Sequence, residues 1–307
     1  MKISIIGAGN VGSLTTLRIA QQGLGEVYLI DVAKGLACGK AFDLEDARSL
    51  IKSDYKITGS EDINQVLGSD IVVMTAGLAR KPGMTREDLV SKNAQIIKEV
   101  CLNIKTLAPK AIVIVVTNPL DVMTYLALKT TGFSSSRVFG MGASLDAARF
   151  NNLISKELKI AARDVEGMVI GCHGEAMIPL PRFSYIKGKP LPEIIDEKTM
   201  EDLVNKTKAR GLEIVSLLGN GSAFFAPSAA ITELVAEIIK NEKRTIGVSA
   251  YLNGEYGVKD VTIGVPCVIG KKGIEDIVEL SLSPEEKNKF HESAQSIRQL
   301  ISQINIL

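Results

Sequence analysis

The chain has 307 residues, and its 36 Lys and Arg against 35 Asp and Glu give a formal net charge of +1. This balance provides no overall field for gathering nucleic acid or an anionic membrane. The hydrophobic fraction of 46% is typical of a folded globular protein and argues against disorder. Four widely separated cysteines exclude a disulfide scaffold and a Cys-x-x-Cys zinc site: Cys38, Cys101, Cys172 and Cys267.

The sequence opens directly on an apolar run that is typical of a first strand rather than of a cleavable leader. No stretch approaches the ~18 uninterrupted apolar residues of a membrane-spanning helix. We therefore expect a cytoplasmic protein.

In the first half of the chain, apolar strand-like runs alternate with helix-length periodic segments. Strands are predicted at 2–6, 26–30, 55–58, 70–75, 111–117 and 137–141, with helices at 10–22 and 87–107. Such alternation predicts an α/β fold in which a parallel sheet carries helices on both faces. Right-handed crossovers make this sheet doubly wound.

From about residue 143 the pattern changes to a mixed α+β domain. Helices are predicted at 144–157, 198–217 and 227–240, and strands at 165–171, 178–186, 245–252 and 261–269. We accordingly predict a Rossmann dinucleotide-binding domain at 1–142 and a substrate domain at 143–307.

The last predicted helix has a clear start and one apolar stripe. Ser283 is the expected N-cap, followed by Pro284 in the first turn and by Glu286 at the capping-box position. The stripe is predicted to pack on its own domain, and it consists of Phe290, Ala294, Ile297, Ile301 and Ile304.

A glycine-rich segment between the first strand and the first helix is typical of dinucleotide binding. It reads Gly7-Ala8-Gly9-Asn10-Val11-Gly12 and fits G-x-G-x-x-G. Its glycines permit a tight turn, close approach of a pyrophosphate and packing of helix on strand. Asp31 ends the second strand, where a carboxylate binds ribose hydroxyls and repels a 2′-phosphate. NAD is therefore favoured over NADP, although nearby Lys34 leaves the strictness of this choice open.

Other candidate residues follow later strands. Asn118 in Thr117-Asn118-Pro119 comes after the 111–117 strand, at the edge of the sheet where ligands bind. Of the two histidines, His173 lies between small residues in Gly171-Cys172-His173-Gly174, whereas His291 is interpreted as a solvated side chain of the last helix.

Asp146 and Arg149 are three residues apart on one predicted helix. They could form a surface ion pair of little consequence. Alternatively, Asp146 orients a histidine and Arg149 binds a carboxylate through both of its nitrogens. The sequence alone leaves both interpretations open.

Five segments, in this order along the chain, resemble the lactate/malate dehydrogenase family, and within it the malate dehydrogenases closest in sequence to lactate dehydrogenases. The resemblance covers essentially the whole chain. The segments are 7–12 together with Asp31, 76–86 (AGLARKPGMTR), 116–119 (VTNP), 145–150 (LDAARF) and 171–175 (GCHGE).

The resemblance implies an oxidoreductase that uses NAD, acts on a small dicarboxylate and forms a homodimer or homotetramer. His173 and Asp146 match the family's general acid–base pair, and an aspartate on a histidine raises its pKa. Arg149 matches the arginine that holds the C1 carboxylate. The remaining matches are Arg86 with the arginine that polarises the reacting carbonyl, Asn118 with a residue that contacts substrate and cofactor, and Asn93, Val116 and Thr117 with further NAD contacts.

Arg80 is the residue on which substrate choice depends. The family position is an arginine in enzymes that bind oxaloacetate and typically a glutamine in those that bind pyruvate. A second substrate carboxylate needs a cation, and an unpaired buried arginine would discriminate against pyruvate. The prediction is therefore reversible oxidation of (S)-malate to oxaloacetate, which serves the citric acid cycle in relatives.

Three alternatives remain beside this prediction. The nearest is a lactate or broad 2-hydroxyacid dehydrogenase, which the nature of residue 80 disfavours. A second is a hydrolase resembling NAD-dependent glycosidases, which needs a metal for which we predict no ligands. A third is a protein that senses NAD without chemistry.

Overall fold

The computed structural model describes residues 1–78, 86–219 and 221–304, and the side chains of 86–88 are not among those described. In this part of the chain an eleven-stranded sheet forms the centre of the molecule, in the order β3-β2-β1-β4-β5-β6-β12-β13-β8-β9, with β14 beside β13. Its strands are β1 (Lys2–Ile6), β2 (Glu26–Ile30), β3 (Ile57–Ser60), β4 (Ile71–Met74), β5 (Ile112–Val115), β6 (Val138–Gly140), β8 (Val169–Gly171), β9 (Met177–Pro179), β12 (Thr245–Asn253), β13 (Lys259–Gly270) and β14 (Gly273–Ile277).

The first six strands pair in parallel, and the sheet continues without a break into the second half of the chain. β6 pairs with β12 in the antiparallel sense, through Ser249 opposite Gly140. The strands β4, β5 and β6 are short and wholly buried, and β4 and β5 consist mainly of β-branched residues, as expected for a sheet covered on both faces. The predicted α/β architecture is therefore confirmed.

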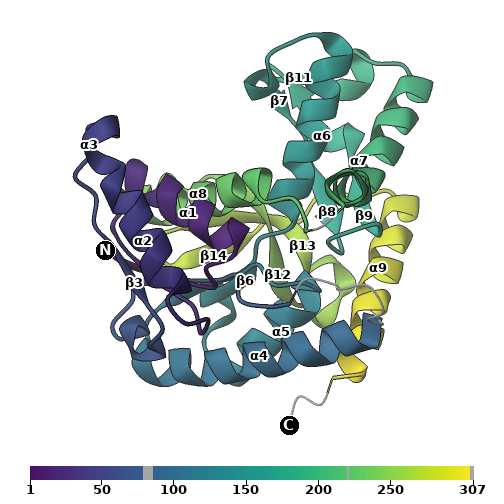
Figure 1. The fold of residues 1–307 in the computed structure, drawn as a ribbon. Coiled ribbons are helices and arrows are strands. Elements are labelled where there is room, and N and C mark those ends of the chain that lie inside the picture. Colours follow the sequence, from purple (N-terminus) through teal and green to yellow (C-terminus); the bar gives the residue numbers. More distant parts are fainter. Residues whose placement is uncertain (79–85, 220, 305–307) are drawn as a thin grey trace.

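Helices cover both faces of the large sheet. Figure 1 shows α1 and α8 on one face and α4 and α5 on the other. The helices are α1 (Asn10–Gln21), α2 (Leu36–Asp46), α3 (Arg48–Ile51), α4 (Arg86–Leu107), α5 (Leu120–Thr131), α6 (Ala143–Leu158), α7 (Glu197–Leu218), α8 (Phe225–Lys240) and α9 (Pro284–Ser302). Short 3₁₀ helices lie at Ile63–Val66, Ser135–Arg137, Ala162–Asp164, Pro181–Phe183, Leu191–Glu193 and Glu255–Gly257.

A small antiparallel sheet lies apart from the large one, near α6 and α7 (Figure 1). Its strands are β7 (Val165–Glu166), β10 (Tyr185–Ile186) and β11 (Lys189–Pro190). A second hydrophobic core lies here, with Phe150 and Ile154 of α6 fully buried in it. The residues predicted as single strands at 165–171 and 178–186 thus form short strands that belong to two different sheets.

The last helix follows the prediction in detail. Ser283 accepts a hydrogen bond from the backbone N–H of Glu286, and the Glu286 carboxylate accepts one from the N–H of Ser283. Phe290, Ala294 and Ile297 are fully buried in the main core, against which Ile301 and Ile304 also pack. The apolar stripe therefore packs on its own domain.

The structure corrects the interpretation of His291 as a solvated side chain. His291 is only partly exposed, and its Nε2 lies 2.9 Å from the backbone carbonyl of Tyr256. The sequence reading missed this contact because the carbonyl belongs to a turn 35 residues earlier in the chain.

Candidate active site

The glycine-rich loop between β1 and α1 has an open outer side. Gly7 has a φ of +108°, and a Cβ there would lie 2.7 Å from the Thr75 hydroxyl oxygen. A Cβ at Gly12 would collide with the carbonyl of Gly7, so glycine is required where helix meets strand. Gly9 differs, because a Cβ there would meet nothing within 4 Å. The loop therefore presents exposed backbone at Gly9 and Asn10 at the N-terminus of α1, where a pyrophosphate can approach.

Two charged side chains form hydrogen bonds to the backbone of this loop. The Asp31 carboxylate accepts hydrogen bonds from the N–H groups of Ala8 at 2.6 Å and Ala33 at 2.9 Å. The Lys40 ammonium of α2 donates to the carbonyl of Ala8 at 2.6 Å and to the Ser13 hydroxyl at 3.0 Å. Asp31 is thus located at the glycine-rich loop as the sequence predicts. Lys40 was not predicted from the sequence, since a lysine on a weakly amphipathic helix belongs to no motif.

Asn93 of α4 joins the segments that follow β4 and β5. It is 1% exposed; its side-chain oxygen accepts from the Leu78 N–H at 2.8 Å, and its amide nitrogen donates to the Asn118 carbonyl at 2.8 Å. The Thr117 hydroxyl donates to the Ala76 carbonyl at 2.6 Å. Beyond β5, Asn118 is exposed and Val116 partly exposed, with the buried Thr117 between them. These hydrogen bonds fix the segments that follow β4 and β5 beside the glycine-rich loop.

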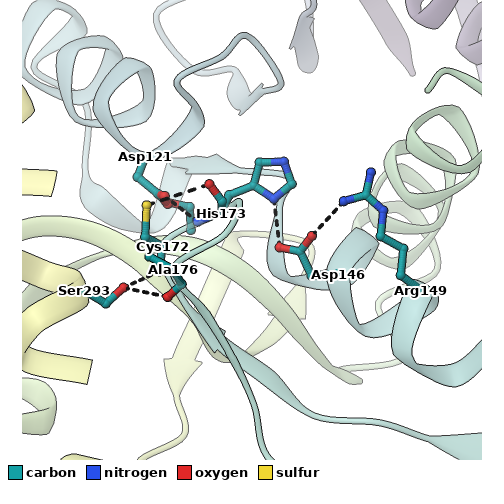
Figure 2. A network of polar contacts seen from close by, with 8 residues as sticks. Asp121, Asp146, Arg149, Cys172, His173, Ala176 and Ser293 are labelled. Carbon is teal, nitrogen blue, oxygen red and sulfur yellow. Dashed lines mark hydrogen bonds and ion pairs between the residues drawn. The ribbon is translucent and has the colours of Figure 1, made fainter. Parts of the chain in front are cut away.

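His173, Asp146 and Arg149 come together at the start of α6. His173 Nδ1 lies 2.8 Å from Asp146 Oδ2, and Arg149 Nη1 donates to Asp146 Oδ1 at 3.2 Å. Figure 2 shows the imidazole and the guanidinium on opposite sides of this carboxylate. The Asp146 side chain is 1% exposed, so the ion pair with Arg149 exists but is buried rather than on the surface, and Asp146 also contacts a histidine as the alternative interpretation predicts.

The surroundings of His173 favour its protonated form. Burial lowers the pKa of His173, but the adjacent Asp146 carboxylate, with a smaller contribution from Asp121, raises it, and the net shift is upward from its usual value. Because a carboxylate accepts hydrogen bonds, Nδ1 carries the proton that bonds to Asp146. Nε2 then has no hydrogen-bond partner among the described residues and is free to exchange a proton with a bound molecule.

A second buried carboxylate, Asp121 near the start of α5, also contacts the His173 segment. Its Oδ2 accepts the backbone N–H of His173 at 2.8 Å, and its Oδ1 accepts the Ser249 hydroxyl at 2.6 Å. Burial raises the pKa of Asp121, an effect that the Ser249 and His173 donors oppose. The sequence analysis did not single out Asp121, because an aspartate in the first turn of a helix is also an ordinary feature.

The side chains of two predicted site residues lie outside the part of the chain that the structure describes. Arg80 lies outside the described residues, and Arg86 begins α4 but its side chain is outside them as well. The expected contacts of both arginines with substrate stay predictions.

The residues around the glycine-rich loop can be compared with what a bound dinucleotide requires. A dinucleotide needs exposed N–H groups at a helix N-terminus, no side chain in front of them, and a carboxylate for a ribose. The open side at Gly9, the N-terminus of α1 and the fixed carboxylate of Asp31 supply these three features. The residues therefore fit NAD.

Comparison with known proteins agrees with this chemistry. Residues 1–140 match the family model for the NAD binding domain of lactate/malate dehydrogenase, and residues 143–306 match the model for its alpha/beta C-terminal domain. The chain belongs to the lactate/malate dehydrogenase family. Its N-terminal half is thus an NAD-binding domain.

Individual relatives are similar over their full length. A malate dehydrogenase of Methanosarcina mazei is 49% identical over 306 residues, which cover 100% of both chains. The crystal structure of a malate dehydrogenase from Cryptosporidium parvum has a TM-score of 0.96 at 41% identity, covering 100% of this chain and 99% of that one. A lactate dehydrogenase from the same organism, complexed with lactic acid and NAD, has a TM-score of 0.94 at 34% identity, covering 98% and 96%. The fold is therefore common to both activities, and sequence identity favours the malate dehydrogenases.

Neither a metal-binding cluster nor a membrane-spanning helix is found among the described residues. In the part of the chain that the structure describes, no three His, Cys, Asp or Glu side chains lie close enough together to hold a metal ion. Over the same residues, no helix is both long and apolar enough to cross a membrane.

Proposed function

We propose that this chain is an NAD-dependent malate dehydrogenase that interconverts (S)-malate and oxaloacetate. The observation that carries the proposal is the buried Asp146 between His173 and Arg149, a proton-transfer group and a carboxylate-binding group held 2.8 and 3.2 Å from one anchor. The full-length similarity to malate dehydrogenases supports the same assignment.

NAD would bind along the surface formed by the glycine-rich loop, Asp31 and the segments that follow β4 and β5. Its pyrophosphate would be held by the loop Gly7-Ala8-Gly9-Asn10-Val11-Gly12 and the adenosine ribose by Asp31. Val116, Thr117, Asn118 and Asn93 would shape the remainder of the groove. Asn93 would do so by fixing backbone, because its amide already bonds to Leu78 and Asn118. When bound, NAD accepts or returns the hydride of the reaction.

His173 serves as general base and general acid through Nε2. In malate oxidation the neutral imidazole takes the proton of the 2-hydroxyl group, and in oxaloacetate reduction the imidazolium returns it to the ketone oxygen. Asp146 keeps Nδ1 protonated, so that Nε2 points its lone pair at the substrate and the positive charge formed is stabilised. Asp146 is thus needed for both directions.

The substrate would be held by its carboxylates. Arg149 presents a guanidinium that is 12% exposed, across Asp146 from His173, and suited to the carboxylate next to the reacting carbon. Asn118 would donate to the substrate from the end of β5. On sequence grounds Arg86 would polarise the reacting carbonyl, and Arg80 would pair with the second carboxylate.

We further propose that the chain divides functionally at residues 142 and 143, with cofactor binding before and substrate binding after, and that it acts in the cytosol. A second copy of the chain is the proposed partner. Exposed apolar side chains on α2–α3 and on α7–α8 would be covered in a homodimer or homotetramer, in which each patch recurs by symmetry. They include Phe42, Leu50, Ile51, Leu212, Leu217 and Phe225. The molar mass from light scattering tests this association.

The decisive experiment compares oxaloacetate with pyruvate at equal concentration by following NADH oxidation at about 340 nm. A preference for oxaloacetate of about a thousandfold, the effect of an unpaired buried charge, supports the proposal. The Arg80→Gln variant should lose most of that preference. Comparable turnover of pyruvate would instead assign a broad 2-hydroxyacid dehydrogenase, and no turnover of either would overturn the chemistry proposed for His173.

A further inference from the structure

His173 is held between two buried carboxylates rather than beside one. Asp146 contacts the ring at Nδ1, and Asp121 contacts the backbone N–H of the same residue at 2.8 Å (Figure 2). The two aspartates come from different helices, α6 and α5, and are 1% and 2% exposed. Two buried acidic side chains on one histidine are costly, since each loses its hydration. A structural role alone would need only one neutral acceptor for that N–H.

Asp121 is itself fixed from several sides. The Ser249 hydroxyl of β12 donates to Oδ1 at 2.6 Å, and the Thr262 hydroxyl of β13 donates to the backbone carbonyl of Asp121 at 2.5 Å. Ser249 and Thr262 are both buried. With the His173 N–H on Oδ2 and the Ser249 hydroxyl on Oδ1, both carboxylate oxygens accept hydrogen bonds, and these donors favour the ionised form against the burial that raises the pKa of Asp121.

The His173 segment is anchored on its other side without charge. The Ser293 hydroxyl of α9 accepts the N–H of Cys172 at 2.8 Å and donates to the Ala176 carbonyl at 3.2 Å. Figure 2 shows this anchor on the side of Cys172 that faces away from Asp146. One side of this turn is thus held by a neutral hydroxyl and the other by the carboxylate of Asp121.

We propose that Asp121 is a positioning residue of the active site, whose negative charge helps to keep His173 protonated while its carboxylate fixes the His173 backbone. The inference rests on the function proposed for His173. The charged and titratable groups facing His173 in the described structure are Asp146 and Arg149 of α6, Asp121 of α5 and the neighbouring Cys172 thiol. Asp121 adds to the attraction of Asp146, and Arg149 opposes both.

The charge of Asp121 can be tested on His173 directly, because the chain contains only two histidines. Each gives one imidazole Cε1–H signal in an NMR titration, and a His173→Gln variant assigns them. In Asp121→Asn, which keeps the shape and an acceptor, we expect the pKa of His173 to fall by about one pH unit. The pKa of His291 serves as the internal reference and should stay unchanged.

A matched variant distinguishes loss of the Asp121 charge from loosening of the turn that contains His173. Thr262→Val removes a buried hydroxyl that bonds to the backbone of Asp121 but leaves its carboxylate intact. It should move the pKa of His173 by less than a third of the Asp121→Asn shift. Equal shifts in the two variants, or none in Asp121→Asn, would overturn the proposal.

If Asp121→Asn does not fold, the unchanged protein still decides the question. A carboxyl ¹³C titration of aspartate-labelled protein must show Asp121 ionised over the pH range in which His173 titrates. A neutral Asp121 in that range overturns the inference. None of these measurements needs turnover, so failure of the proposed function would show separately, as absence of oxaloacetate reduction in the unchanged protein.

Discussion

The glycine-rich loop and the surroundings of His173 are stabilised in different ways. The loop belongs to one β-α unit, and its shape depends on the absence of side chains at Gly7 and Gly12. The His173 centre draws on α5, α6, α9 and β12, and depends on charges that burial strengthens. Local backbone geometry thus prepares the binding of a cofactor, whereas proton transfer requires groups that only the tertiary fold can assemble.

Among the tests that separate the glycine-rich loop from the His173 centre, a substitution of Asp146 should have the largest effect. In Asp146→Asn the amide can hold either ring tautomer of His173 and no longer stabilises the imidazolium. We expect kcat/KM for oxaloacetate to fall by roughly 10³- to 10⁴-fold. NADH affinity, measured by NADH fluorescence because the chain has no tryptophan, should change less than about twofold. A variant that loses NADH binding and turnover together would show that the two regions are not separable.

The glycine-rich loop offers a matched pair of substitutions with opposite consequences. A Cβ at Gly12 would collide with the Gly7 carbonyl, so Gly12→Ala should lower the free energy of unfolding by about 1–3 kcal/mol. Gly9 has an ordinary φ of −66°, and a Cβ there meets nothing. Gly9→Ala should therefore keep the melting temperature and weaken NADH binding about tenfold, since it intrudes only on bound cofactor. Equal destabilisation in both variants would contradict the open side of the loop.

The pH dependence of turnover tests the surroundings of His173. Since the pKa of His173 is raised, its imidazolium persists to higher pH than in an exposed histidine. We expect kcat/KM for oxaloacetate to stay constant at low pH and to fall as the pH rises through the folded pKa, with the opposite trend for malate. The stability that this pKa shift contributes is present below about pH 6.5 and is lost over the same rise. A profile with its midpoint below that of free histidine would contradict the role of Asp146.

The same contrast explains what the sequence could predict. The loop, Asp31 and the parallel strands were predictable, because each follows from contiguous residues or from a period of two or 3.6. α5 was not among the predicted helices, since it is buried almost all round and has no polar face to reveal a helical period. Asp121 was missed because its partners Ser249 and Thr262 are more than 120 residues away. His173 and Asp146 were candidates from residue type and spacing, the family resemblance supplied their roles, and only the structure shows that Asp146 contacts His173 and Arg149 at the same time.

Substitution of Lys40 should have the smallest effect. Lys40 combines the two kinds of stabilisation, because its charged side chain fixes the backbone of the glycine-rich loop. Its ammonium donates to the Ala8 carbonyl, so a charge from α2 fixes the backbone of the residue whose N–H donates to Asp31. Lys40→Met keeps most of the aliphatic chain and removes this donor, which should raise the Kd for NADH three- to tenfold, about 0.7–1.4 kcal/mol. Lys34→Met, which removes an exposed lysine near Asp31, is the control and should leave the Kd unchanged. If both variants weaken NADH binding equally, the effect of Lys40 is long-range attraction of the phosphates, and the loop holds its shape through its glycines and Asp31 alone.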